Sequence, residues 1–583
     1  MRTGSPPSTA VICCLATSSG VNIGEIPLWG SFPPRTVNLQ GESMLVVSDV
    51  YTLPDLLARA VNRSPDADAV VFPNQRVTYS QLFQRATNTA RSLKALGVDS
   101  GDSVGILMSN CQEFVDLLLG SQFIGAIPVP INARYKAKEL AYVIDDAQLK
   151  VLMTTDRIVE HVDFVSLLQE AFPDIINQEN PESLSLTTAE NLKSIVLFGG
   201  RSPDGMIDQG NFESIREQVP EETIEIDRSR LKIRDIAMMM YTSGTTANPK
   251  GCPITHEALV RPAVEAGRTR FKMTADDRMW DPLPMFHMSF VLPLIGCIDA
   301  GAALLTMEYF EPASALAYME SENATLNFAS FPTIMEALLN HKDYDSEALK
   351  IRIVNNVGPA DLLVSMQKRM PKAIQISAYG LTECGGVVSF GHVEDSLEKR
   401  TETSGRLFRG IEAQIRDPET DEILGSDQQG EILIRGYCVF EGYHNAPEKN
   451  EEAFTSDGWF RTGDLCSLDD EGRVTYHGRI KDMLKVGGEN VAAVEIEGFL
   501  SHHPAIQLAQ VVSAPDNKYI EVPAAFIQLK EGMSATEEEI IDFCKGQLSS
   551  FKIPRYVRFV TEWPMSATKI QKIRLREQIA AEL

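Results

Sequence analysis

The sequence is poor in cysteine, has no long apolar run and carries far fewer basic than acidic residues. Its nine cysteines stand singly among 583 residues apart from Cys13-Cys14, and none shows the CxxC spacing of a zinc site. This scarcity favours a reducing compartment, so a cytoplasmic location is expected. No apolar run approaches the roughly 20 residues that a membrane-spanning helix needs, which predicts the absence of a transmembrane segment.

The shortage of basic residues excludes one class of partner. Lysine and arginine number 54 against 80 aspartate and glutamate residues, and the formal net charge is −26. Nucleic acids and anionic membranes select proteins with a basic face, so no nucleic-acid partner is predicted. The hydrophobic content of 44% is ample for packed cores, and the length favours two or more domains.

The first 43 residues are low in charge and rich in serine, proline and threonine. The apolar segment Ala10–Ala16 follows Arg2, but no cleavage site of a signal peptide comes after it. We therefore expect residues 1–46 to form a disordered tail, or Met44 to be the functional start.

Short apolar strands alternate with helices over most of the chain, from about residue 46 to residue 390. Residues 156–230 lack this clear pattern and are expected to include surface loops that extend from the core. The alternation predicts an α/β fold with stacked, doubly wound parallel sheets that are covered on both faces. The expected helices span Leu53–Asn62, Ser80–Leu96, Glu113–Gly125 and Lys138–Asp145, and the expected strands span Ala69–Phe72, Ser103–Met108, Ile127–Val129, Val151–Met153 and Ile236–Met240.

The pattern changes towards the C-terminus. Residues 405–478 contain strands separated by turns, which predicts an antiparallel, β-barrel-like subdomain. After Gly478 a small α+β unit follows, so we expect an N-terminal domain at 47–480 and a C-terminal domain at 481–583. Its expected elements are the helices Val491–Leu500 and Thr536–Leu548, the strands Leu508–Ser513, Pro523–Leu529 and Tyr556–Val560, and a helix from Ile570 to the end.

A run of small hydroxyl and glycine residues follows the strand Ile236–Met240. Such a run lets backbone N–H groups approach a polyphosphate, and Lys250 adds a positive charge. It is not a Walker A loop, because Pro249 stands where that motif has its second glycine. Taken alone, the run also fits a simple flexible turn. Its candidate phosphate-binding residues are Thr242, Ser243, Gly244, Thr245, Thr246 and Lys250.

Two further motifs carry groups that suit a nucleotide. In Tyr379-Gly-Leu-Thr-Glu383 the tyrosine can stack on a purine, Thr382 can donate to phosphate and Glu383 can bind Mg²⁺. Asp464 can accept both hydroxyls of a ribose, and Arg479 can reach a ribose or a phosphate. Each motif alone also fits an ordinary turn.

In this order and spacing the motifs resemble the adenylate-forming superfamily, which comprises acyl-CoA synthetases, adenylation domains of peptide synthetases, and luciferases. The resemblance extends from about Val47 to the C-terminus. It also takes in the segments Pro130–Arg134, Gly430–Gly436, Gly442-Tyr443 and Gly487–Asn490.

The resemblance implies ATP, Mg²⁺ and coenzyme A as cofactors and co-substrates. It makes Glu383 the Mg²⁺ ligand, Tyr379 the adenine-stacking residue, and Asp464 with Arg479 the ribose clamp. Further residues implied at the nucleotide are Gly358, Pro359, Ala360, Ala378, Gly380 and Thr382.

The resemblance also implies that the C-terminal domain is a small mobile lid that turns about Lys481. Lys569 matches the family's catalytic lysine, although Lys572 lies close by and competes for the role. The face at Gly487, Gly488 and Glu489 is implied to meet coenzyme A. The expected catalytic residues are Lys569, Thr242, Lys250 and His287.

The chain departs from the family pattern at two positions. Ala247 replaces a usual glycine of the phosphate loop, and Thr568 directly precedes Lys569 where the family has Thr-Gly. A non-catalytic relative that only binds a nucleotide or an acyl chain would show such changes, so this reading stays open.

The segment Pro282–Phe290 matches the family's acyl pocket. Amino-acid-activating relatives have an aspartate where this chain has His287, so the resemblance implies a different acid, with His287 as a wall or gate. An apolar lining favours a fatty or bulky alicyclic carboxylate. The stretch also resembles bacterial carnitine- and fatty-acid-CoA ligases, but no carboxylate that would bind the cation of a betaine is evident. The implied lining residues are Phe290, Val291, Gly296, Val357, Gly358 and Ala378.

The function predicted from these residues is that of an ATP-dependent carboxylate–CoA ligase, which forms an acyl-adenylate, releases pyrophosphate and then makes the CoA thioester. An acyl-AMP ligase that loads a carrier protein is the enzymatic alternative. Those relatives often carry an insertion before the lid, and the short interval from Arg479 to Gly487 has none. The expected partners are a small carboxylic acid, ATP and CoA, and a homodimer is compatible with the sequence.

Overall fold

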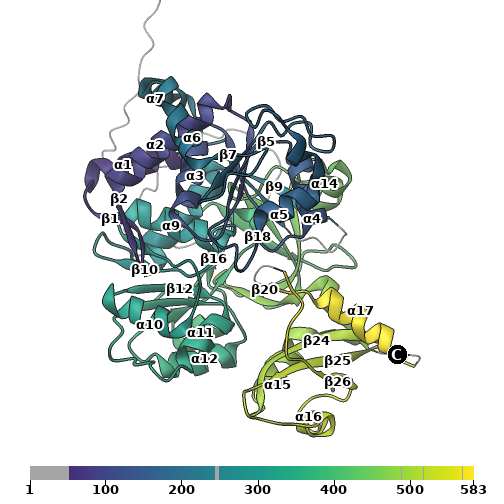
Figure 1. Ribbon diagram of the computed structural model, residues 1–583. Coiled ribbons are helices and arrows are strands. Elements are labelled where there is room, and N and C mark those ends of the chain that lie inside the picture. Colours follow the sequence, from purple (N-terminus) through teal and green to yellow (C-terminus); the bar gives the residue numbers. More distant parts are fainter. Residues whose placement is uncertain (1–50, 243–247, 487–488, 517, 567–568) are drawn as a thin grey trace, which may run out of the picture. The chain divides into compact units, whose positions relative to one another are not determined.

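The computed structural model describes residues 51–242, 248–486, 489–516, 518–566 and 569–583 (Figure 1). The N-terminal tail expected at residues 1–46 lies outside this range. None of the helices in the described part of the chain has both the length and the apolar character required to cross a bilayer.

Two mainly parallel sheets confirm the predicted α/β class. In one, all five strands run parallel in the order β4-β3-β5-β6-β7, and every residue of β3 and β6 is buried. Because side chains alternate between the faces of a strand, this burial means that both faces of the sheet are covered. The strands are β3 (Ser103–Leu107), β4 (Ile127–Pro130), β5 (Leu149–Thr155), β6 (Ser194–Phe198) and β7 (Ile207–Asp208).

The other sheet has the order β14-β13-β12-β10-β11-β1-β2, and only the pairing of β1 with β2 is antiparallel. The loops after its parallel strands gather at one edge, where α/β proteins bind their ligands. Its strands are β1 (Asp68–Phe72), β2 (Gln75–Thr78), β10 (Arg278–Trp280), β11 (Ala303–Leu305), β12 (Leu326–Ser330), β13 (Ile353–Asn356) and β14 (Ile374–Ile376).

Helix ends follow the local signals of the sequence. The Thr52 hydroxyl accepts from the Asp55 N–H at 3.3 Å and caps α1. Gly97, with a φ of +80°, follows the end of α2. The helices of this part are α1 (Leu53–Arg63), α2 (Tyr79–Ala95), α3 (Gln112–Phe123), α4 (Ala137–Asp146), α5 (Phe164–Ala171), α6 (Gln209–Ser214), α7 (Glu221–Arg230), α8 (His256–Glu265), α9 (Met288–Ala300), α10 (Pro312–Ser321), α11 (Pro332–Leu339), α12 (Ala360–Arg369), α13 (Leu397–Glu402) and α14 (Pro447–Ala453).

Residues 156–230 are more regular than the sequence indicated. They hold β6 within the five-stranded sheet, together with β7 and the helices α5, α6 and α7. The buried strand Ser194–Phe198 is only five residues long. Its polar flanks hide it from a search for periodicity.

From β15 to β21 every strand pairing is antiparallel, in agreement with the change of character predicted for residues 405–478, although it starts somewhat earlier, at Ala378. A three-stranded sheet, β15-β16-β17, and a four-stranded sheet, β18-β19-β20-β21, are linked by a bridge between Arg406 and Arg473. A separate hairpin joins β8 (Ile236–Thr242) to β9 (Lys250–Thr255). The other strands are β15 (Ala378–Tyr379), β16 (Ser389–Phe390), β17 (Arg406–Leu407), β18 (Ile411–Arg416), β19 (Gly430–Gly436), β20 (Phe460–Leu468) and β21 (Val474–Arg479).

The C-terminal part has a hydrophobic cluster of its own, whose buried members lie between Leu484 and Ile579. The predicted helix at Val491–Leu500 starts later, at Ala493, because residues 489–492 pair with 483–486. Thr536 and Glu539 form the expected capping box. The elements are β22 (Met483–Val486), β23 (Glu489–Ala492), α15 (Ala493–Leu500), β24 (Ile506–Asp516), β25 (Ile520–Leu529), α16 (Glu537–Cys544), β26 (Tyr556–Phe559), β27 (Met565–Ser566), β28 (Lys569–Ile570) and α17 (Lys572–Glu582).

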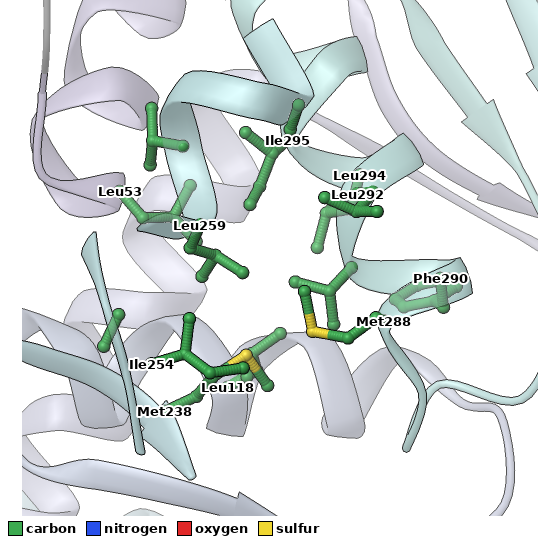
Figure 2. Packing of buried hydrophobic residues seen from close by; sticks show 14 of the residues in the cluster. Leu53, Leu118, Met238, Ile254, Leu259, Met288, Phe290, Leu292, Leu294 and Ile295 are labelled. Carbon is green, nitrogen blue, oxygen red and sulfur yellow. The ribbon is translucent and has the colours of Figure 1, made fainter. Parts of the chain in front are cut away.

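One apolar cluster fixes the hairpin β8–β9 and helix α9. Figure 2 shows Met238 and Ile254 of the hairpin packed beside Leu259 of α8, with Leu118 of α3 and Ile295 of α9 in the same cluster. Burial of such side chains contributes about 1.5–3 kcal/mol each. The hairpin is therefore held firmly to the body at its base.

Candidate active site

The ends of the predicted phosphate loop are set by the hairpin β8–β9. Thr242 and Lys250 are paired across it, and the Thr242 hydroxyl lies 3.8 Å from the sulfur of Cys252. The hairpin forms because the strand Ile236–Met240 is apolar and buries Met238. Of the predicted phosphate-binding residues, Ser243, Gly244, Thr245 and Thr246 lie outside the described part of the chain, as does Ala247.

The ammonium group of Lys250 lies 3.9 Å from the centroid of the Tyr443 ring, in cation–π contact. The segment that carries Tyr443 passes close to the hairpin, because the His444 N–H donates to the Gly251 carbonyl at 2.9 Å. A Cβ on Gly251 would meet side-chain atoms of both His444 and Tyr241 at 3.1 Å, so the absence of a side chain lets these segments pack closely.

Glu383 lies on a single 3₁₀ turn, Thr382–Cys384, directly after β15. Its Oε1 accepts from the Tyr443 hydroxyl at 2.9 Å. Gly380 lets the chain turn back here, since a Cβ would lie 2.3 Å from the carbonyl oxygen of Gly386. Gly380 is exposed, and Thr382 and Glu383 are half-buried, so the turn is open to a ligand.

The donors at this turn fit Mg²⁺ bound together with a nucleotide. Within the described residues, Oε2 of Glu383 has no hydrogen-bond partner, and no group of three or more His, Cys, Asp or Glu side chains could enclose a metal. Mg²⁺ commonly binds through one or two carboxylates, water and substrate phosphates. Glu383 can serve as that one carboxylate.

The Asp464 carboxylate joins Tyr379 to Arg479. Its Oδ2 accepts from the Tyr379 hydroxyl at 2.8 Å, and its Oδ1 lies 2.7 Å from Nε of Arg479, its partner across β20 and β21. Asp464 is only 2% exposed. Each carboxylate oxygen has a second lone pair, so Asp464 can still accept hydroxyls of a ribose.

The charges of this cluster reinforce one another. Burial, together with the charge of Asp464, raises the pKa of Tyr379 well above its usual 10, so the hydroxyl remains a donor. Burial alone would lower the pKa of Arg479, but the charges of Asp464, Tyr476 and Glu383 outweigh it, and that pKa is raised. The contribution of Glu383 to the raised pKa of Arg479 indicates that the predicted metal ligand lies near the predicted ribose clamp.

Tyr379 is held more tightly than a free stacking residue would be. It is buried, its hydroxyl is engaged by Asp464, and its ring faces Tyr476 at a centroid distance of 6.1 Å and an interplanar angle of 27°. The predicted contact with adenine remains a prediction.

The segment 357–360 follows strand β13 at the edge where such sheets bind ligands. Pro359 is the residue before α12, and Ala360 begins that helix. Val357 is 43% exposed, and Gly358 and Ala378 are half-buried. These residues are accessible, as a ligand site requires.

Several residues that were predicted to line the acyl pocket lie on α9, which begins directly after His287. The His287 ring lies 4.9 Å from that of Phe286. Phe290 and Val291 are fully buried within the large apolar cluster. Gly296 faces Gly267, and the sulfur of Met273 lies 3.4 and 3.2 Å from the Cβ positions that these two glycines lack. Val357, which was predicted to line the same pocket, is in contrast exposed.

Contacts in the C-terminal part separate the two candidate lysines. Nζ of Lys572 lies 2.5 Å from Oε1 of Glu497, which also accepts from the Val511 N–H at 2.7 Å. Lys569 lies on β28, paired with Ser566, and its side chain is outside the described part. Lys572 is thus engaged in an ion pair within this domain, which favours Lys569 as the candidate for the catalytic lysine.

The hinge candidate Lys481 lies on a 3₁₀ turn, Ile480–Asp482, and is exposed. Arg576 of α17 donates to its carbonyl at 3.4 Å and pairs with Asp482. Of the residues predicted to meet coenzyme A, Gly487 and Gly488 lie outside the described residues, and Glu489 is described only as part of β23.

Tyr443 is a site residue to which the sequence assigned no role. Gly442-Tyr443 was recognised as part of a motif, but its contacts with Lys250 and Glu383 join segments far apart in the chain. A tyrosine in a loop gives no local sign of such contacts.

The fold and the site together define an enzyme that binds a nucleotide. The family model of AMP-binding enzymes matches residues 57–444, and that of the AMP-binding enzyme C-terminal domain matches residues 495–569. The chain therefore belongs to the AMP-binding enzyme family.

Curated relatives match over most of their length. YngI of Bacillus subtilis (strain 168), which carries the name of an acyl-CoA synthetase, is 35% identical over 537 residues, covering 90% of this chain and 97% of the relative. The mitochondrial medium-chain acyl-CoA ligase ACSF2 of Rattus norvegicus is 32% identical, covering 91% and 88%.

Solved structures agree with this assignment. ATP-bound MatB from Rhodopseudomonas palustris has a TM-score of 0.77 at 26% identity, covering 91% of this chain and 99% of that one. The anthranilate CoA ligase AuaEII, in complex with anthranoyl-AMP, has a TM-score of 0.78 at 27% identity, covering 92% and 98%. Family, relatives and fold agree on an AMP-forming, ATP-dependent acid–CoA ligase.

Proposed function

We propose that this chain activates a fatty or bulky apolar carboxylic acid with MgATP and transfers the acyl group to coenzyme A. The observation that carries the proposal is the joint site of Glu383, Tyr443 and Lys250 with Tyr379, Asp464 and Arg479. It combines a metal ligand, a cation for phosphate and an acceptor for ribose.

The first step joins two anions. An oxygen of the carboxylate attacks the α-phosphorus of ATP, the bond to the β-phosphate oxygen breaks, and pyrophosphate leaves with the bonding electrons. Lys569 neutralises the charge that develops at the α-phosphate, while Lys250 and the loop that begins at Thr242 hold the departing phosphates. Mg²⁺ held by Glu383 would offset charge on the phosphate oxygens.

In the second step the thiol of coenzyme A loses its proton to water, its sulfur attacks the acyl carbon, and the bond from that carbon to the phosphate oxygen breaks, so that AMP leaves with the bonding electrons. The lid turns about Lys481, which withdraws Lys569 and presents Gly487, Gly488 and Glu489 to the incoming thiol. Lid movements of this kind often limit turnover. Asp464 and Arg479 keep the ribose in place through both steps.

The apolar surroundings of α9 support the choice of acid. Phe290 and Val291 lie in the apolar cluster, and no aspartate follows Phe286 to pair with an amine. The rat relative is by name a medium-chain ligase, which agrees with a fatty substrate. His287 stands at the start of α9 as a wall or gate. A cytoplasmic location and a homodimer remain predictions.

A direct test follows both products. The purified protein is incubated with ATP, Mg²⁺ and a panel of carboxylates, with and without CoA. We expect apolar acids to give both pyrophosphate and the CoA thioester. Pyrophosphate without thioester would favour loading of a carrier protein, and no pyrophosphate with any acid would favour the non-catalytic reading. Removal of Mg²⁺ with EDTA should abolish pyrophosphate release.

A further inference from the structure

The segment Phe440–His444 lies between the metal ligand and the phosphate hairpin. At one end, the Phe440 N–H donates to the carbonyl of Glu383 at 2.9 Å. At the other, the His444 N–H donates to the carbonyl of Gly251, also at 2.9 Å. The segment is therefore tied by main-chain bonds both to the turn that bears Glu383 and to the strand that bears Lys250.

Tyr443 contacts both functional side chains at once. Its hydroxyl donates to Oε1 of Glu383 at 2.9 Å, and its ring lies 3.9 Å from the ammonium of Lys250. The first distance is typical of a hydrogen bond and the second of a cation–π contact. Within the described residues, no ion pair joins Lys250 to Glu383. The tyrosine engages the anion at its hydroxyl and the cation at its ring.

Tyr443 is itself fixed by its neighbours. Its N–H donates to Oδ1 of Asn450 at 2.7 Å, and Nδ2 of Asn450 donates back to its carbonyl at 3.0 Å. The ring meets Phe440 edge-on, at 4.8 Å and 79°. Gly442 has a φ of +136°, which disfavours any side chain, and a Cβ there would lie 2.9 Å from the side-chain amide of Asn450. The ring is thus placed without help from a ligand.

We propose that Tyr443 is a positioning residue that prepares Glu383 and Lys250 for MgATP. The inference rests on the proposed role of Glu383 as the Mg²⁺ ligand. Oppositely charged groups near each other tend to pair directly, and such a pair would occupy both the metal ligand and the phosphate-binding cation. By binding one group at each end, Tyr443 keeps Oε2 of Glu383 and the charge of Lys250 available.

The test separates the two contacts. Tyr443→Phe removes the hydroxyl but keeps the ring, whereas Tyr443→Leu removes both. Binding of Mn²⁺ is measured by electron paramagnetic resonance with an ATP analogue that cannot be cleaved. We expect Tyr443→Phe to weaken Mn²⁺ binding about tenfold, as loss of an outer partner of a metal ligand does. Tyr443→Leu should also weaken binding of the analogue in the absence of metal.

Asn450→Ala provides a second variant that touches neither Glu383 nor Lys250. The substitution removes both hydrogen bonds between the Asn450 side chain and the Tyr443 main chain. We expect Mn²⁺ binding to weaken about threefold, which is less than the loss expected for Tyr443→Phe. Thermal unfolding and the KM for the acid serve as readouts of general damage, and both should stay near the parent values in Tyr443→Phe.

Tyr437→Phe is the matched control. Tyr437, like Tyr443, lies between strands β19 and β20, and its ring also contacts a cation, the guanidinium of Arg261 at 3.7 Å. Its hydroxyl has no hydrogen-bond partner in the described structure. Its Mn²⁺ binding should be unchanged. Equal binding in Tyr443→Phe and the parent, while Glu383→Gln loses affinity, would overturn the proposal for Tyr443. Unchanged binding in Glu383→Gln would instead overturn the assigned metal ligand.

Discussion

The proposed nucleotide side and the proposed acyl side of this site are held in different ways. On the nucleotide side, polar side chains bind one another directly, as in the bonds from Tyr379 to Asp464 and from Tyr443 to Glu383. On the acyl side, Phe290 and Val291 of α9 belong to the same apolar cluster as the body of the domain. The nucleotide groups are thus preorganised by directional bonds, and the acyl side is shaped by packing.

The difference predicts two kinds of mutational effect. Loss of a charge on the nucleotide side should reduce rate or ATP affinity for every acid. A change of volume on the acyl side should alter which acid is preferred and leave ATP binding unchanged.

The largest effect is expected for Lys569→Ala. Loss of a cation at the developing charge should slow adenylation by about 10²- to 10³-fold, with transfer to CoA from preformed acyl-adenylate retained. The two half-reactions are measured separately. Lys572→Ala, which breaks the contact with Glu497, is the control and should cost much less rate. A greater loss of adenylation in Lys572→Ala would assign the catalytic role to Lys572.

His256, the first residue of α8, makes a buried polar contact with α1 that responds to pH. Its Nδ1 accepts from the N–H of Leu53 at the start of α1, and burial lowers the pKa of His256 to about 4. The unfolded state, with a histidine pKa of about 6.5, takes up a proton first as pH falls, so the stabilisation is present above about 6.5 and is lost towards 4.

The expected loss over this range is on the order of 3 kcal/mol in the free energy of unfolding. Denaturant unfolding between pH 7 and pH 4.5 measures it. His256→Asn can keep the acceptor without titrating, so its stability should depend less on pH. Equal pH dependence in the two proteins would show that His256 is not the group responsible.

Asp464→Asn tests the polar cluster of the nucleotide side. The amide can accept at one atom only, so either the ribose or Arg479 loses a charged acceptor. We expect the KM for ATP to rise roughly 10- to 100-fold, the equivalent of about 1.5–3 kcal/mol. The KM for the acid, obtained in the same steady-state kinetics, should stay within about twofold. An equal rise in both constants would contradict a division of the site into two sides.

The smallest effect is expected for Met273→Ala. The change removes the thioether that covers Gly267 and Gly296, and the added room should favour a longer or bulkier acid by about tenfold in relative kcat/KM. Competition between acids of different length measures this ratio. Met319→Ala, a buried methionine of α10 in another apolar cluster, should leave the preference unchanged. No shift in Met273→Ala would place the acyl group elsewhere.

The same difference explains what the sequence could predict. Asp464, Arg479, Glu383 and Lys250 lie in short motifs with ordered spacing, so the sequence alone was enough to propose roles for them. The buried strand Ser194–Phe198 takes its place by pairing with β5, and Tyr443 contacts Lys250 and Glu383, which lie in other segments of the chain. Met273 covers Gly296 through packing alone, and packing leaves no periodic signal.

The central claim is that the acid is adenylated before CoA takes part. The most direct measurement is exchange of labelled pyrophosphate into ATP, with Mg²⁺ and a medium-chain fatty acid and without CoA. The account predicts exchange that depends on the acid and is lost in Lys569→Ala. Acid-dependent exchange that appears only after CoA is added, or no exchange with any apolar acid, would contradict it.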